Sequence, residues 1–93
     1  MRDRHTDAFF VVQCSRNEAG TARLGMAVST RAAGNSVVRN RLRRLIRESF
    51  RMHRQDLPSV DVLVTARPAA AQAENRVVFE SLEGLWARVR AKA

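Results

Sequence analysis

The chain has 93 residues, the length of a single domain with a modest core. Hydrophobic residues make up 45% of it, which excludes a chain that is disordered throughout. There are 17 basic and 9 acidic residues, so the net charge is +8. A field this strong on a small surface favours polyanionic partners, nucleic acid before an anionic membrane. We expect residues 1–93 to form a single RNA-binding domain.

Residue types set further limits. Sixteen of the 17 basic residues are Arg, which suits RNA because guanidinium forks match phosphates and base edges, although a GC-rich genome would give the same ratio. Cys14 is the only cysteine, which excludes an internal disulfide and a multi-cysteine zinc site, and we expect it in the core. No apolar run reaches transmembrane length, and the start Met1–Asp7 is too polar for a signal peptide. The expected location is the cytoplasm, without a membrane partner.

The first half of the chain predicts two strands. Residues 8–14 (AFFVVQC) are β-branched and aromatic, and residues 23–29 (RLGMAVS) form the second strand. The turn signal at 17–20 predicts a hairpin between them. Phe9 and Val11 point to one face of the first strand, and Phe10 and Val12 point to the other. One face should meet the core, and the other needs a covering element or a ligand.

The second half predicts two helices around a third strand. A helical period runs from Ser36 to about Arg54 and ends at Leu57-Pro58. Residues 60–66 (VDVLVTA) predict a strand in the middle of a sheet, and residues 72–90 predict a helix with an apolar stripe through Leu82 and Trp86. The order β-β-α-β-α indicates an α+β fold, a two-layer α/β sandwich in which two helices cover a small mixed sheet.

The helix at 36–54 has two contrasting faces. At about 100° per residue, one arc is mainly apolar and the opposite arc is basic. The apolar arc contains Val38, Leu42, Leu45, Ile46, Ser49 and His53. The basic arc contains Arg39, Arg43, Arg47, Arg51 and Arg54, joined by Asn40 and Arg44. Like charges at this spacing repel, and Glu48 is the one acid placed to pair, with Arg44. An absent polyanion explains the row better than a solvated or membrane-bound helix does.

Two positions beside this helix have open interpretations. Arg41 lies next to the apolar arc, so it either reaches around to the basic face or anchors the structure. Gly34-Asn35 is either a plain turn with a helix cap or a junction whose free backbone N–H groups hold a phosphate.

The stretch from Gly34 to Arg51 (GNSVVRNRLRRLIRESFR) resembles the signature of the bacterial ribonuclease P protein component. Its centre is Arg39-Asn40-Arg41, followed by basic residues at 43, 44 and 47. The flanking segments 24–29, 57–67 and 82–86 also resemble the family, so the likeness covers about residues 9–89.

The resemblance implies a fold like the second domain of ribosomal protein S5, with a left-handed β-α-β crossover. It implies a protein subunit of ribonuclease P, an endonuclease that removes the 5′ leader of precursor tRNA. In that enzyme the RNA subunit performs the hydrolysis with Mg²⁺, so the chain itself would supply no catalytic residue and bind no metal or cofactor.

The resemblance also assigns binding residues by position. Those expected to contact the RNA subunit are Arg31, Gly34, Asn35, Arg39, Asn40, Arg41, Arg43, Arg44, Arg47 and Arg51. An exposed sheet face would hold the single-stranded leader, stacking its bases with little sequence preference. Its candidate residues are Phe9, Val11 and either Val62 or Val64.

The sequence departs from the family in two places. Family members usually begin with a Phe-rich N-terminal helix that walls the leader cleft, whereas this chain is expected to start almost at the first strand. Without that helix we expect weaker leader binding and an uncovered apolar sheet face, through which a dimer could form. The loop before the motif often carries paired basic residues, whereas Thr30–Ala33 supplies Arg31 alone.

Other functions leave weaker traces. Asp3, His5 and Asp7 have a spacing that suggests a metal site, but a polar terminus is expected to be disordered. His53 lies on the inward arc, and no phosphate loop or Ser/His pairing indicates an independent enzyme. The alternatives are a ribosomal or other structured-RNA binding protein of the same fold, and a helix that docks on an acidic protein.

Overall fold

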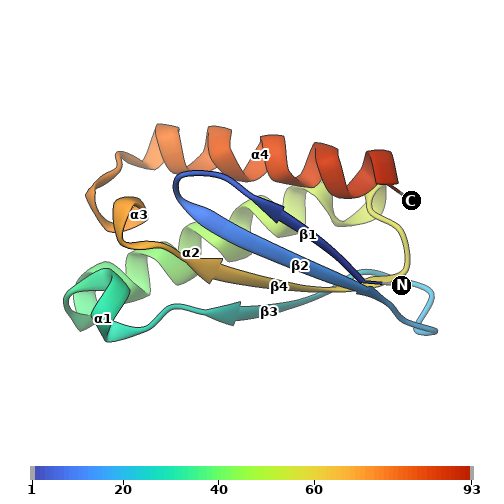
Figure 1. Cartoon of the computed structure of the whole chain (residues 1–93), viewed down its shortest axis with the longest axis horizontal. Coiled ribbons are helices and arrows are strands. Elements are labelled where there is room, and N and C mark those ends of the chain that lie inside the picture. Colours follow the sequence, from blue (N-terminus) through green and yellow to red (C-terminus); the bar gives the residue numbers. More distant parts are fainter. Residues whose placement is uncertain (1, 93) are drawn as a thin grey trace.

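The computed structural model describes residues 2–92 and shows a sheet layer and a helix layer (Figure 1). In chain order the elements are β1 (Arg2–Thr6), β2 (Phe10–Arg16), β3 (Arg23–Ala27), α1 (Thr30–Ala33), α2 (Ser36–His53), the 3₁₀ turn η1 (Arg54–Asp56), β4 (Val60–Ala66), α3 (Pro68–Gln72) and α4 (Asn75–Lys92). The two long helices, α2 and α4, pack on one face of the mixed sheet (Figure 1). The predicted two-layer α+β sandwich is confirmed.

The strand order is β1-β2-β4-β3, so the predicted hairpin between the segments now called β2 and β3 is wrong. β4 lies between them, antiparallel to β2 and parallel to β3. β4 is the most apolar strand, and this central position pairs both of its edges, whereas a β2–β3 hairpin would leave one edge of β4 open. The adjacent parallel pair β3 and β4 is connected through α2, which makes this segment a β-α-β crossover.

The N-terminal segment is ordered, contrary to the expected disorder around Asp3, His5 and Asp7. Residues 2–6 form β1, which pairs antiparallel with β2. The Asp7 carboxylate closes the turn by accepting hydrogen bonds from the backbone N–H groups of Phe9 (2.8 Å) and Phe10 (2.9 Å). It also accepts a hydrogen bond from the hydroxyl of Ser81 on α4. Asp7 is therefore a turn cap and an anchor to α4, and it also explains why the strand begins at Phe10.

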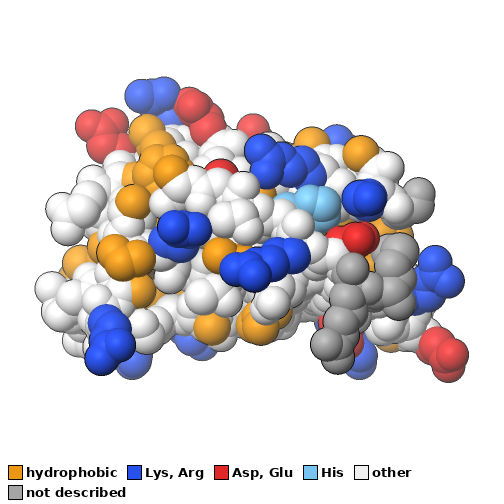
Figure 2. Space-filling model, viewed as in Figure 1, with side chains coloured by type: hydrophobic (Ala, Val, Ile, Leu, Met, Phe, Trp, Pro, Cys, Tyr) orange, Lys and Arg blue, Asp and Glu red, His pale blue; other side chains and the backbone are white. Residues whose placement is uncertain are grey.

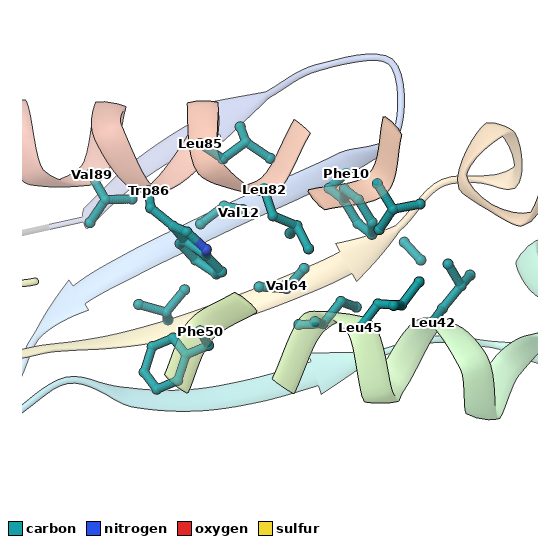
Figure 3. Close-up of a cluster of buried hydrophobic side chains, with 14 of the residues drawn as sticks. Phe10, Val12, Leu42, Leu45, Phe50, Val64, Leu82, Leu85, Trp86 and Val89 are labelled. Carbon is teal, nitrogen blue, oxygen red and sulfur yellow. The ribbon is translucent and has the colours of Figure 1, made fainter. Parts of the chain in front are cut away.

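The core fills the space between the sheet and the two long helices (Figure 3). Its fully buried side chains include Phe10, Val12, Val62 and Val64 from the strands, and Leu42, Leu45, Ile46, Leu82, Leu85 and Trp86 from the helices. The Trp86 indole N–H donates to the Ser49 hydroxyl at 2.9 Å, which satisfies the two buried polar groups. Phe50 meets the Trp86 ring edge to face, with centroids 5.8 Å apart. The sheet is thus closed on its helix side.

Candidate nucleic-acid interface

The outward face of α2 carries the exposed part of the basic motif. Asn40, Arg44, Arg47 and Arg51 are exposed, while Leu42, Leu45, Ile46 and Ser49 on the opposite side are buried. The predicted two-faced helix is confirmed. We call the residues Arg39, Asn40, Arg43, Arg44, Arg47 and Arg51 the cationic face. Arg39 and Arg43 form its half-buried shoulder, because their positions on the helix border the buried side.

No carboxylate of the described residues forms an ion pair with an Arg of the cationic face. Among residues 2–92, ion pairs join Arg23 to Asp61, Arg76 to Glu80 and Arg90 to Asp56, and His53 Nε2 lies 3.7 Å from Glu83 Oε1. None of these contacts includes an Arg of the cationic face. The expected pairing of Glu48 with Arg44 is not among them. Figure 2 shows a different side of the molecule, along β1, β2 and α4, on which acidic and basic side chains are interspersed. Charge of one sign is therefore concentrated on α2.

Two Arg side chains near the motif are engaged internally. Arg54, expected on the basic arc, begins η1 and donates from Nε to the Ala22 carbonyl at 3.1 Å. Arg41 donates from Nη1 to Asn75 Oδ1 at 2.6 Å, and from Nη2 to the carbonyls of Ala71 and Ala73 at 3.3 and 3.2 Å. Of the two interpretations of Arg41, the structure shows the anchor.

The junction before α2 is a well-formed cap. Gly34 has φ of 90°, a conformation that favours glycine, and its N–H donates to the Thr30 carbonyl at 2.7 Å to end α1. Asn35 then accepts the Val38 N–H through Oδ1 at 2.9 Å and begins α2. Arg31 is exposed in α1. This geometry fixes where the cationic face starts, and a phosphate at the junction stays a prediction.

The other face of the sheet has no helix over it and contains a groove of about 610 Å³. Residues of all four strands line it, among them Arg4, Gln13, Arg23, Gly25, Asp61 and Leu63. Most of these side chains are polar, and Leu63 is the large apolar side chain of the groove that is exposed, at 40%. We call this surface the open face. It differs from the expected apolar surface.

The leader candidates from the sequence are divided by the strand register. Val62 and Val64 point to the helices and are 2% and 0% exposed, so the expectation that either lies on the uncovered face is wrong. Val11 alternates to the open face and is half-buried, while Phe9 precedes β2 and packs against the core edge. Leu63 was missed. Leu63 lies between Val62 and Val64 in the sequence, so it points to the opposite face of the strand from them. This alternation identifies Leu63 as a groove residue only once it is known which face the helices cover.

An ion pair shapes the open face. The Arg23 guanidinium donates to Asp61 from Nε at 2.8 Å and from Nη2 at 3.1 Å, and Asn17 donates to the same carboxylate at 2.9 Å. These hydrogen bonds, that of Arg23 first, lower the pKa of Asp61 below its ordinary value. The same pairing raises the pKa of Arg23. Arg23 and Asp61 therefore stay charged and mutually neutralised at neutral pH.

Sites for other chemistry receive no support from the described residues. Cys14 is buried, as predicted, and this burial, followed by the nearby Asp3 charge, raises the pKa of its thiol to about 11. The thiol is therefore protonated at neutral pH and a poor nucleophile. Between residues 2 and 92, no group of three potential metal-ligating His, Cys, Asp or Glu side chains gathers. Nor does this part of the chain contain a helix with the length and apolarity to cross a membrane.

Taken together, the fold and its surfaces define a small α/β protein of the polyanion-binding class, with one unpaired cationic helix face and an open sheet face. Comparison with known proteins narrows the class. The family model for Ribonuclease P matches residues 1–90. The chain belongs to the ribonuclease P protein family, the protein subunits of the endoribonuclease that matures the 5′ end of tRNA.

Individual relatives agree with this assignment. The ribonuclease P protein component of Thioalkalivibrio sulfidiphilus is 45% identical over 84 residues, which are 90% of this chain and 70% of the relative. That of Halorhodospira halophila is 40% identical over 89 residues, 96% of this chain and 73% of the relative. Among solved structures, the Staphylococcus aureus RNase P protein aligns with a TM-score of 0.84 at 34% identity, covering 89% of this chain and 76% of the other. The RNase P protein of Thermotoga maritima aligns with a TM-score of 0.86 at 28% identity, covering 95% of this chain and 86% of the other.

Proposed function

We propose that the cationic face of α2 binds the ribonuclease P RNA, and that the open face of the sheet holds the 5′ leader of precursor tRNA. In this proposal the RNA subunit, with Mg²⁺, carries out the hydrolysis in the cytoplasm. The protein contributes affinity and positions the substrate.

One observation supports the proposal that the cationic face binds RNA. Its guanidiniums have no carboxylate within ion-pair distance among residues 2–92. Arg residues on one helix face repel each other unless a polyanion neutralises them. Phosphates spaced along an RNA helix supply that charge, and each contact releases counterions. The packing of Leu45 and Ile46 on the opposite side holds the face rigidly toward solvent.

The open face suits a single strand for a different reason. Its groove combines the flat surface around Gly25 and Leu63 with the polar groups of Arg4 and Gln13. A Cβ at Gly25 would lie 3.5 Å from Leu63 Cδ1, so glycine keeps the floor of the groove low. Bases can stack on such a floor with little sequence preference, while the Arg4 side chain, which is outside the Arg23–Asp61 pair, meets the backbone. This supports the leader as occupant.

A dimer through the open face is the competing occupant. The lining of this face mixes charged side chains with the apolar surface of Leu24 and Leu63, which favours the leader, because the centre of a stable dimer interface is depleted in charged residues. Sedimentation velocity of the chain alone distinguishes the two. A monomer that binds a short single-stranded RNA supports the proposal, and a dimer that the RNA does not dissociate opposes it.

The cleavage assay tests the function directly. The purified chain is added to its cognate RNA subunit at low Mg²⁺, and removal of the precursor tRNA leader is followed. We expect restored cleavage with the RNA subunit, and none from the protein without it. If cleavage is not stimulated and the chain binds ribosomal RNA instead, the chain acts as a ribosomal-type RNA-binding protein. The third alternative is that the helix docks on an acidic protein. A competition experiment distinguishes it, in which RNA is tested for its ability to displace an acidic protein from the chain.

A further inference from the structure

We propose that Arg41 is a positioning residue of the RNA-binding helix: it clamps α2 to the junction between α3 and α4, and it does not contact a phosphate. The inference rests on the proposed function of the cationic face. It assigns Arg41 a different role from Arg43, Arg44 and Arg47, although all four belong to the same basic motif.

The geometry of the Arg41 guanidinium is that of an internal clamp. Its Nη1 reaches Asn75 Oδ1 at 2.6 Å, and its Nη2 reaches the carbonyls of Ala71 at 3.3 Å and Ala73 at 3.2 Å. These acceptors lie 30 to 34 positions further along the sequence. One side chain of α2 therefore fixes the end of α3 and the start of α4.

The acceptors explain why an Arg is needed. Carbonyls at the end of a helix lack intrahelical donors, and Ala71 lies in the last turn of α3 while Ala73 is its C-cap. A planar fork serves these carbonyls and the Asn75 side chain together, whereas the single ammonium of a Lys cannot reproduce that geometry.

The surroundings of Arg41 also separate it from the cationic face. Its side chain lies on the flank of α2 that adjoins α3 and α4, whereas Arg43, which is also half-buried, lies beside residues of β3 and β4. All three acceptors are neutral, so the Arg41 side chain is held by hydrogen bonds and not by an ion pair. Nη2 already serves two carbonyls and Nη1 serves Asn75, so a phosphate could not bind the edge formed by these two nitrogens without breaking the clamp. Arg41 thus acts on RNA binding through the backbone that it holds.

The test compares four variants of the full chain: Arg41→Ala, Arg41→Lys, Asn75→Ala and Arg44→Ala. Affinity for the RNA subunit is measured across salt concentrations at a temperature where circular dichroism shows every variant folded. Asn75→Ala is the informative partner, because it removes a clamp acceptor without changing any charge.

We expect Arg41→Ala and Asn75→Ala each to weaken binding by about 2- to 10-fold, the effect of one or two net hydrogen bonds, with the wild-type salt slope retained. The double variant should bind no more weakly than Arg41→Ala, since both changes open the same clamp. Arg41→Lys should keep the charge and yet fail to restore affinity or melting temperature. Arg44→Ala should reduce the slope by about 0.7–0.9.

Two results would overturn the proposal. One is a salt slope for Arg41→Ala that falls as far as that of Arg44→Ala. The other is wild-type affinity for Asn75→Ala beside a loss for Arg41→Ala. Failure of the proposed function has a separate signature, because Arg44→Ala would then have the wild-type slope whatever Arg41 does.

Discussion

At the scale of the residue, the partner of each Arg decides its role. Arg44 and Arg47 are exposed on α2 without a carboxylate partner among the described residues, so they are available to phosphates. Arg41 and Arg54 donate to backbone carbonyls and hold loops in place. Arg76 forms an exposed pair with Glu80, which is worth little and belongs to a solvated surface. Residues of one type in one chain thus perform three tasks.

The unpaired residues yield a first prediction. Arg43→Ala and Arg47→Ala should each lower RNA affinity and reduce the slope of log affinity against log salt by about one contact, because each removes one phosphate partner. Arg76→Ala is the matched control, with the same loss of charge on α4. Equal slopes for all three variants would mean that charge alone, and not its place on α2, determines binding.

Asp61 yields a second prediction, on pH. Its folded-state pKa is lowered, so the stability it contributes is present above its unfolded pKa of about 4 and is lost as pH falls through the folded value. As the pH falls below about 4, the urea midpoint of the wild type should therefore drop more steeply than that of Asp61→Asn. Parallel pH profiles would show that the Arg23–Asp61 pair adds no acid-side stability.

At the scale of the element, α2 separates stability from binding. Its inner side contacts the sheet and α4 through Leu42, Leu45 and Ile46, and its Ser49 is matched to Trp86. Its outer side contains no core residue. The caps at Asn35 and Gly34 fix where the helix starts. Because the helix is rigid, the rotation about its axis that buries Leu45 also determines which Arg side chains are exposed.

This division predicts that Leu45→Ala destabilises the fold by about 2–5 kcal/mol, the cost of a large cavity at a side chain that is 2% exposed. Urea unfolding measures it. Met52→Ala is the control on the same helix, since Met52 is 69% exposed and should cost little. If Leu45→Ala and Arg47→Ala lost the same stability and neither had a separate binding defect, the two-faced description of α2 would be wrong.

At the scale of the whole molecule, the net charge of +8 is unevenly placed. Three of the nine acids, Asp56, Asp61 and Glu80, pair with Arg residues outside α2, and no ion pair neutralises an Arg of the cationic face among residues 2–92. The domain is therefore polarised, which orients it during encounter with a polyanion.

Polarisation predicts a steep overall salt dependence. If the five Arg side chains of the cationic face each meet a phosphate, the slope of log affinity against log salt should be about −3.5 to −4.5. Fluorescence anisotropy of labelled RNA subunit between low and physiological salt measures it. A slope near −1 would limit the interface to one or two contacts and contradict a binding role for the face as a whole.

Local patterns of residues were sufficient to predict the fold class, the two long helices, the central strand and the two-sided character of α2. These features follow from local periodicity, because an element that buries one side repeats its apolar residues at the period of its own geometry. The motif from Gly34 to Arg51 also led to the family, which the comparisons established.

Tertiary structure alone decided the remaining features. It placed β4 between β2 and β3, ordered β1 through Asp7 and Ser81, and turned Val62 and Val64 inward so that Leu63 lies on the open face. It also brought Asn75 to Arg41 across 34 positions. Pairing partners and the covered side of a strand depend on contacts between distant segments. Local patterns do not encode these contacts, because either face of an apolar strand and either neighbour in a sheet satisfies the same period.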